Sequence, residues 1–93
     1  MFGEGITVVK RDGSKEPFIY EKVVVSLLKA GADVAAARRI ALRVICQIPG
    51  SEVDAKTLTR LILNELKAAN PQWYHNWIVF DRAVKRRETE KEL

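Results

Sequence analysis

Three short breaks divide most of the chain into helical segments. They fall at Gly31, at Pro49-Gly50-Ser51 and at Asn70-Pro71, where glycine, proline and asparagine end regular structure. Between and beyond these breaks, apolar residues recur three and four positions apart, which is the spacing of one helix face. The sequence therefore predicts four helices, over residues 20–30, 34–48, 55–69 and 72–87, and a charged tail over residues 88–93.

The apolar stripes of these helices are the expected core. Asp33 and Asp54 precede the second and third helices and are expected to cap their free backbone N–H groups. The stripe residues, in chain order, are Val24, Leu27 and Leu28; Val34, Ala37, Ile40, Ala41, Val44, Ile45 and Ile48; Leu58, Leu61, Ile62, Leu66 and Ala69; and Trp73, Trp77, Phe80 and Val84.

A β-hairpin is predicted ahead of the helices, over residues 6–18. The β-branched run Thr7-Val8-Val9 is followed by Asp12-Gly13, which is typical of a two-residue type I′ turn because both central residues need positive φ. Pro17 has no N–H for a sheet ladder, so the second strand should be an edge that ends near Phe18. The expected fold is α+β and mostly α, with a two-stranded hairpin lid packed on a four-helix bundle in a single domain spanning residues 1–93.

Length and composition exclude several classes of protein. The chain has 93 residues, of which 47% are hydrophobic and 30% charged, and this composition is typical of a globular domain. We expect a single domain, because this length leaves no room for an additional, catalytic domain. No apolar stretch approaches the ~18 to 20 residues of a membrane span, and the N-terminus lacks a signal-peptide pattern, so we expect a cytoplasmic protein. A single cysteine and a single histidine argue against a disulfide framework or a structural metal.

The common catalytic motifs do not occur in the sequence. It contains no G-x-S-x-G, no Walker-type glycine-rich loop and no H-E-x-x-H. Cys46 falls within the apolar second helix and is expected to be a buried, inert thiol. His75 is expected to be a solvated or capping group rather than a catalyst. We therefore predict that this chain is not an enzyme.

The densest polar cluster lies at the predicted hairpin tip, from Lys10 to Glu16. The chain carries 16 Lys and Arg against 12 Asp and Glu, and this mild positive excess suits a compact anionic ligand. Arg11 offers bidentate geometry and Lys10 a mobile point charge. Lys22 lies near the start of the first helix, where its ammonium and free backbone N–H groups could both face phosphate. On residue types alone, an ordinary solvated turn is the favoured interpretation over a ligand site.

The run VVKRDGSKEPFIYEKV, residues 8–23, resembles the opening motif of the ATP-cone family. The likeness continues through the helical spacing and the stretch WIVFDRAVKR, so that it covers about residues 6–87. ATP-cones are regulatory nucleotide-binding domains of ribonucleotide reductases, of the zinc-ribbon repressor of reductase genes and of an archaeal 2-phosphoglycerate kinase. The resemblance implies a non-catalytic domain that binds ATP or dATP, with Mg²⁺ accompanying the nucleotide, and that signals to an attached or partner protein.

The resemblance also implies a set of nucleotide-binding residues: Val9, Lys10, Arg11, Glu16, Lys22, Thr59 and Arg86. Four cations among them, Lys10, Arg11, Lys22 and Arg86, would surround the triphosphate, and we infer separately that their charges would balance its own. Glu16 accepts hydrogen bonds only, so it would approach the ribose or the base rather than a phosphate.

The chain departs from the family pattern on the side of the nucleoside. Ile19 stands where the family often has Asn or Asp, and Ala55 and Thr59 stand at polar positions that open the third helix. The loss of hydrogen bonds there puts discrimination of the base or deoxyribose in doubt, at about 1 kcal/mol for each bond. Lys56, Thr57 or Thr59 could substitute.

Two other functions remain open from the residues alone. The basic residues of the second helix most simply form a solvated face, but together with the end of the fourth helix they could bind nucleic acid; they are Arg38, Arg39, Arg43, Arg86 and Arg87. The aromatic fourth helix could instead mediate protein interaction or self-association, although the spacing of Trp73 and Trp77 favours core packing.

Overall fold

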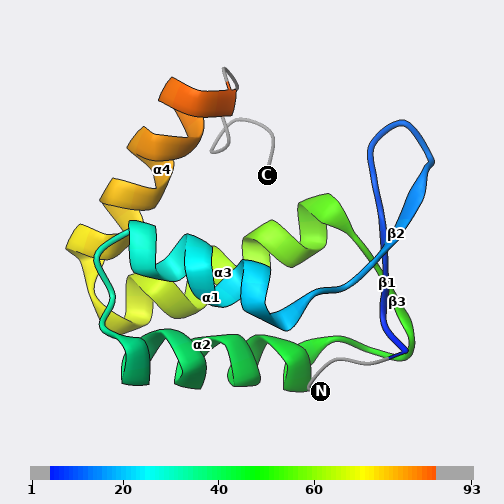
Figure 1. Cartoon of the computed structure of the whole chain (residues 1–93), viewed down its shortest axis with the longest axis horizontal. Coiled ribbons are helices and arrows are strands. Elements are labelled where there is room, and N and C mark those ends of the chain that lie inside the picture. Colours follow the sequence, from blue (N-terminus) through cyan, green and yellow to red (C-terminus); the bar gives the residue numbers. More distant parts are fainter. Residues whose placement is uncertain (1–4, 86–93) are drawn as a thin grey trace.

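The computed structural model describes residues 5–85, with side chains for residues 5–80. The fold is α+β and mostly helical, and a small sheet lies at one side of the helices (Figure 1). Each predicted helix is present and begins within one residue of its expected start. The helices are α1 Tyr20–Lys29, α2 Val34–Gln47, α3 Ala55–Ala69 and α4 Pro71–Lys85, and the strands are β1 Thr7–Val9, β2 Lys15–Pro17 and β3 Glu52–Asp54. The expected charged tail, residues 88–93, lies outside the described residues.

The sheet has three strands in the order β2-β1-β3, so the expectation of a two-stranded hairpin was incomplete. β1 pairs antiparallel with β2 and parallel with β3, and Val8 stands opposite both Glu16 and Val53. Val53 is the single apolar residue of β3, so this strand has no alternating pattern that a sequence could reveal. As Pro17 predicted, β2 is an edge strand.

The hairpin turn differs from the predicted two-residue type. The N–H of Lys10 donates to the carbonyl of Ser14 (2.8 Å), and the N–H of Gly13 donates to the carbonyl of Lys10 (3.0 Å). These bonds close a three-residue loop whose last residue, Gly13, has φ +88°. The Asp12 carboxylate accepts hydrogen bonds from the Ser14 hydroxyl and N–H, and these bonds lower the pKa of Asp12. Asp12 therefore orders the loop through its side chain.

The predicted stop after α1 is confirmed. The N–H of Gly31 donates to the carbonyl of Leu28, and the N–H of Ala32 donates to that of Leu27. This pair of bonds is a Schellman motif, which requires a left-handed residue, and Gly31 has φ +111°. A Cβ at Gly31 would lie 3.1 Å from the Trp73 ring, so both backbone conformation and packing favour glycine here.

The two predicted N-caps are also confirmed. The Asp33 carboxylate accepts a hydrogen bond from the N–H of Ala36 at 2.8 Å, at the start of α2. The Asp54 carboxylate accepts from the N–H of Thr57 at 2.8 Å and from its hydroxyl at 2.9 Å, at the start of α3. Asp54 is at the same time the last residue of β3, so one residue ends a strand and caps the next helix.

The core lies between α1, α2 and α3, which pack as neighbours in chain order. Its largest fully buried side chains are Val24, Leu27, Ile40, Val44, Leu63 and Leu66. α4 packs on α3 and α1, and it contributes the buried residues Trp77 and Ile78. Figure 1 shows α4 rising steeply away from the other helices, so the arrangement is not a regular four-helix bundle.

Several stripe positions are exposed, and the prediction of a buried thiol at Cys46 was wrong. Cys46 follows Val44 by two residues, about 200° around the helix, and therefore lies on the outer face of α2. Val34 is 56% exposed at the first turn of α2, and Phe80 is 39% exposed on α4. Ala69 is exposed at the last residue of α3. Predicting burial from a periodic apolar stripe therefore fails for residues at helix ends and on outward faces.

We expect Gly31→Ala to destabilise the fold by about 1–3 kcal/mol, through positive φ and through contact with the Trp73 ring. Gly50→Ala is the matched control, because Gly50 has φ +84° but a Cβ there would meet nothing within 4 Å. Both changes restrict the unfolded chain equally, so that contribution cancels in the comparison. Urea unfolding would measure the difference, and equal losses for the two variants would show that Trp73 moves away without cost.

The Asp54 cap should also make stability dependent on pH. The Thr57 N–H, and then its hydroxyl, lower the pKa of Asp54 from its ordinary value of 3.8. A lowered pKa in the folded state means that the contribution is present above the unfolded value and is lost as pH falls through the folded one. Asp54→Asn keeps a capping oxygen but does not titrate. Between pH ~5 and ~2 the variant should lose less stability than the wild type in urea unfolding; parallel losses would contradict this assignment.

Candidate functional site

A pocket of about 650 Å³ lies where the hairpin faces the helices. A volume of this size is ordinary for a small-molecule site. Its walls come from the hairpin and the β2–α1 connection on one side and from α1, α3 and α4 on the other. The lining residues are Val8, Lys10, Arg11, Asp12, Glu16, Pro17, Phe18, Ile19, Lys22, Val23, Ser26, Ala55, Leu58, Thr59, Ile62 and Trp77.

Most of the residues expected to bind a nucleotide line this one pocket. Lys10, Arg11, Glu16, Lys22 and Thr59 are all on its wall. Two others are not placed there. Val9 is half-buried in β1 and is not among the lining residues, and Arg86 lies outside the described part of the chain.

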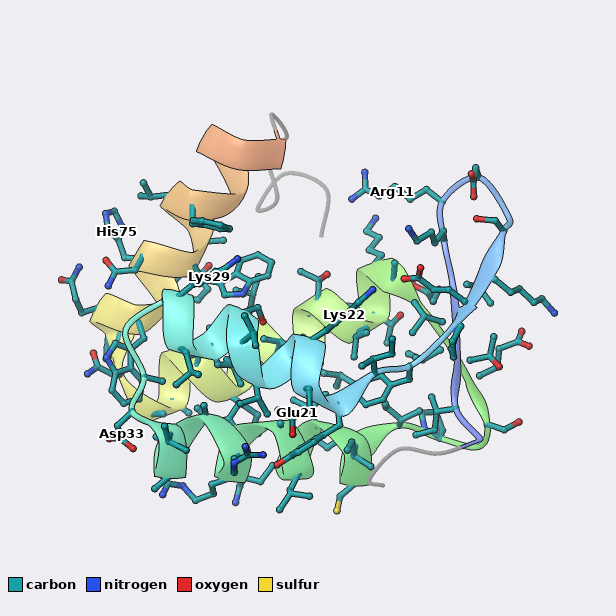
Figure 2. The ribbon with its side chains drawn as sticks, in the orientation of Figure 1. Arg11, Glu21, Lys22, Lys29, Asp33 and His75 are labelled. Carbon is teal, nitrogen blue, oxygen red and sulfur yellow. The ribbon has the colours of Figure 1, made fainter. Side chains whose placement is uncertain are left out.

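The basic residues reach the pocket from separate elements. Figure 2 shows Arg11 extending from the hairpin loop back over the helices, while Lys22 extends from α1 toward the hairpin. The described lining contains three cations, Lys10, Arg11 and Lys22, and two carboxylates, Asp12 and Glu16, which leaves one positive charge in excess. The wall is therefore positive overall but contains its own acceptors.

Lys10 and Glu16 form an ion pair across the hairpin. The ammonium nitrogen of Lys10 lies 3.4 Å from a carboxylate oxygen of Glu16, and the two side chains are 51% and 42% exposed. Exposed pairs of this kind contribute ~0–1 kcal/mol, because water screens them and because long side chains lose freedom in them. An anion with several oxygens could therefore displace Glu16 from Lys10 at little cost.

The start of α1 differs from the starts of α2 and α3. Its N-cap residue is Ile19, which has no side chain to accept a hydrogen bond from the first turn. The two other helices are capped by aspartates at this position. Ile19 and Lys22 both line the pocket, so the positive end of the α1 dipole and the Lys22 ammonium act on the same space. This combination favours a bound anion.

Another part of the pocket is apolar and aromatic. Phe18 is 7% exposed and Trp77 is 8% exposed, and Leu58 and Ile62 of α3 line the same pocket. Trp77 therefore serves both the core, as its spacing predicted, and the pocket wall. An apolar surface with aromatic rings suits a planar heterocycle, which can be buried against it.

Lys56, Thr57 and Thr59, the possible substitutes for the lost polar groups, differ in whether they line the pocket. Ile19, Ala55 and Thr59, the three departures from the family pattern, all line the pocket. Lys56 and Thr57 do not line it, and the Thr57 hydroxyl is engaged by Asp54 at 2.9 Å. Of the three proposed substitutes, Thr59 alone has the position for the role.

The pocket includes residues that the sequence did not assign to a site. Phe18, Ser26 and Leu58 come from the β2–α1 connection, α1 and α3, and Trp77 was assigned to the core. The aromatic stripe of the fourth helix was the one available signal. The others are ordinary apolar or small residues, and contacts between elements distant in sequence bring them together.

Within the described residues, the cationic surface of α2 and the aromatic surface of α4 are largely occupied by internal contacts, and Arg86 and Arg87 lie outside those residues. Arg38 donates to Glu21 at 3.1 Å, and its contacts with Tyr20 and then Glu21 raise the pKa of Arg38. Arg43 donates to Glu65. The α2 face therefore carries compensated charge, apart from Arg39. On α4, Trp77 is buried and Trp73 is half-buried.

His75 is not among the residues that line the pocket. No group of three or more His, Cys, Asp or Glu side chains that could hold a metal ion occurs among the residues described. His75 is exposed on α4 and points away from the hairpin (Figure 2), in agreement with a solvated group. Across the described residues, no helix is long and apolar enough to cross a membrane. The cations and the apolar surface in the lining suit an anion joined to an apolar ring.

Comparison with known proteins agrees with this geometry. No curated protein matches the chain significantly. The family model of the ATP cone domain matches residues 6–89, a range that contains the hairpin, the four helices and every lining residue of the pocket. ATP cone domains are regulatory domains that bind ATP or dATP and are not catalytic by themselves. Residues 6–89 account for most of the 93-residue chain, and the protein belongs to the ATP-cone family.

Proposed function

We propose that this chain is a non-catalytic regulatory domain that binds ATP or dATP beneath its hairpin and passes the nucleotide state to an attached or partner protein. One observation carries the proposal. Arg11 and Lys22, from separate elements, line the same pocket as an apolar wall that contains Trp77. Membership of the ATP-cone family supports it.

The two parts of the pocket suit the two parts of a nucleotide. Lys10, Arg11, Lys22 and the uncapped start of α1 are proposed to hold the phosphates. Arg86, which lies outside the described residues, is proposed to complete the phosphate site. The apolar wall is proposed to hold the base. Mg²⁺ would arrive with the triphosphate. Contacts from Val9 and Thr59 complete the proposed set.

Exchange of ion pairs gives a simple binding mechanism. Phosphate oxygens attract Lys10 more strongly than a single exposed carboxylate does, so Lys10 leaves Glu16 when the triphosphate enters. The released Glu16 carboxylate accepts hydrogen bonds and is available to a ribose hydroxyl. The nucleotide thus replaces one contact within the hairpin by contacts between the hairpin and the helices.

The sheet offers a route by which this exchange reaches the rest of the domain. β1 carries the hairpin loop and pairs with β3, and β3 runs directly into the Asp54 cap of α3. A ligand that pulls the loop toward α1 therefore acts on the start of α3 as well. Regulation additionally requires that ATP and dATP bind the relevant states of the domain with different free energies.

Calorimetric titration of the chain with ATP and dATP would test the proposal. Arg11→Ala and Lys22→Ala should each weaken binding by about ten-fold or more, because hydrogen bonds to charged groups contribute ~1.5–3 kcal/mol. Arg39→Ala is the matched control, since it removes an exposed cation that lies outside the pocket and should leave the affinity unchanged.

The outcomes separate the parts of the proposal. Absence of binding heat with any adenine nucleotide at millimolar concentration would refute it. Normal binding by Arg11→Ala together with weakened binding by Lys22→Ala would refute the role of the hairpin as a lid, but it would leave nucleotide binding in the pocket intact. Equal weakening by Arg39→Ala would indicate general electrostatic attraction rather than a site.

A further inference from the structure

We propose that a groove between α1 and α4 docks an acidic amphipathic helix of a partner protein, and that nucleotide binding weakens this docking. The groove has a volume of about 400 Å³. Its lining residues are Ile19, Glu21, Lys22, Val25, Ser26, Lys29 and Phe80. The effect of the nucleotide rests on the proposed function, whereas docking in the α1–α4 groove does not depend on it.

One face of α1 lines the α1–α4 groove. Lys22, Val25, Ser26 and Lys29 follow each other at positions i, i+3, i+4 and i+7, and residues with this spacing share a helix face. The face points away from the core, since Val25 is 45% exposed while its neighbour Val24 is 1% exposed. Lys22 and Lys29, at its two ends, stand about 10.5 Å apart along the helix axis.

The apolar part of the α1–α4 groove comes from three segments. Ile19 precedes α1, Val25 lies within it and Phe80 belongs to α4, and these side chains are 38%, 45% and 39% exposed. Asn76 of α4 donates to the carbonyl of Ala30 at 2.9 Å, which fixes α4 against the end of α1. Single exposed apolar residues are ordinary, but three that share one groove are typical of an interaction surface.

The charged part of the α1–α4 groove is positive. Among the described residues, neither Lys22 nor Lys29 has an acidic partner, and the ammonium of Lys29 lies 5.5 Å from the centroid of the Phe80 ring. Glu21, the one carboxylate among the described lining residues, is paired with Arg38 of α2 at 3.1 Å. Figure 2 shows Glu21 directed toward α2 and the two lysines on the side of α1 away from α2. Two uncompensated cations therefore flank an apolar stretch.

An acidic amphipathic helix matches this pattern of charge. A segment that reads Glu-x-x-Leu-Leu-x-x-Glu presents two carboxylates on one face, about 10.5 Å apart, with apolar side chains between them. An amphipathic helix lying in a groove is a common mode of recognition. A second copy of this chain fits poorly, because it would bring lysines against lysines. Nucleic acid is also a poorer match, because its phosphates would face the exposed apolar residues.

The α1–α4 groove shares residues with the nucleotide pocket. Ile19, Lys22 and Ser26 line both. One ammonium group cannot pair fully with a phosphate and with a partner carboxylate at the same time, and the two anionic ligands repel each other. Nucleotide and partner therefore weaken each other by the same factor, as linkage requires. Since an exposed ion pair is at stake, we expect this factor to be about two- to five-fold.

Fluorescence anisotropy with labelled peptides would test docking on the full chain without nucleotide. The probe is a peptide of about 18 residues that repeats Glu-x-x-Leu-Leu-x-x-Glu, with Ala and Gln at the x positions, because shorter helices are marginal in water. We expect saturable binding, and about ten-fold weaker binding both when Lys replaces Glu and when the same residues are permuted out of register. No saturable binding at millimolar peptide, or equal binding of the Lys peptide, would overturn the proposal.

Substitutions locate the binding of the acidic peptide. Lys29→Gln and Val25→Ser should each weaken it about three-fold or more and leave the affinity for ATP unchanged, because neither residue lines the nucleotide pocket. Lys67→Gln is the matched control for charge, since its ammonium lies 5.5 Å from the Tyr74 ring, away from the groove. Val34→Ser is the control for the exposed valine, at the first turn of α2. With folding verified by circular dichroism melts, equal losses in variants and controls would refute this location.

The same peptide titration at saturating ATP tests the coupling, with saturation established by calorimetry. We expect the peptide to bind about two- to five-fold more weakly. An unchanged or higher peptide affinity would refute the coupling and leave both binding sites intact. If calorimetry detects no nucleotide binding, the proposed function fails and the coupling with it, whereas docking is decided by the titrations without nucleotide. Sedimentation of the chain alone covers the remaining occupant: self-association that Val25→Ser abolishes would assign the groove to a second copy and overturn the acidic partner.

Discussion

The double pairing of β1 is the interaction on which the rest of the structure depends. A two-stranded hairpin is marginal alone, and this one gains a third strand from the segment that joins α2 to α3. Val8 and Val53, opposite each other in that pairing, are both buried. The sheet thereby fixes the hairpin against the helices and leaves the loop at its tip to face them. β3 thereby helps to fix the loop cations relative to the helices.

The lining of the pocket combines a charged part with an apolar part. On the hairpin wall, exposed charges are paired weakly and can be exchanged, as the Lys10–Glu16 pair illustrates. Another part of the lining, which includes Phe18, Leu58 and Trp77, is apolar and suits a weakly polar ligand surface. A ligand that is strongly anionic at one end and weakly polar at the other satisfies both walls. This match between the molecule and a nucleotide follows from the arrangement of the walls rather than from any single residue.

Much of the fold could be predicted from local signals, and the failures have physical causes. Gly31, Asp33 and Asp54 were identified correctly because a stop or a cap involves residues within a few positions of each other. β3 was missed because its stability comes from a parallel partner far away in the sequence. The exposure of Cys46 was misjudged although its angle around α2 was available, because membership of an apolar helix was taken to mean burial.

For the candidate site, the sequence by itself determined the cations, through a charged hairpin tip followed by Lys22 at a helix start. Those features are local, and a motif can carry them. Only the tertiary structure decided which apolar residues face the cations, because Phe18, Leu58 and Trp77 come from three separate segments that meet by packing. It also decided that Thr59 and not Thr57 is available to a ligand, since Thr57 is held by the cap of its own helix. Charge and helix ends are encoded locally, whereas the composition of a cavity wall depends on which surfaces the core brings together.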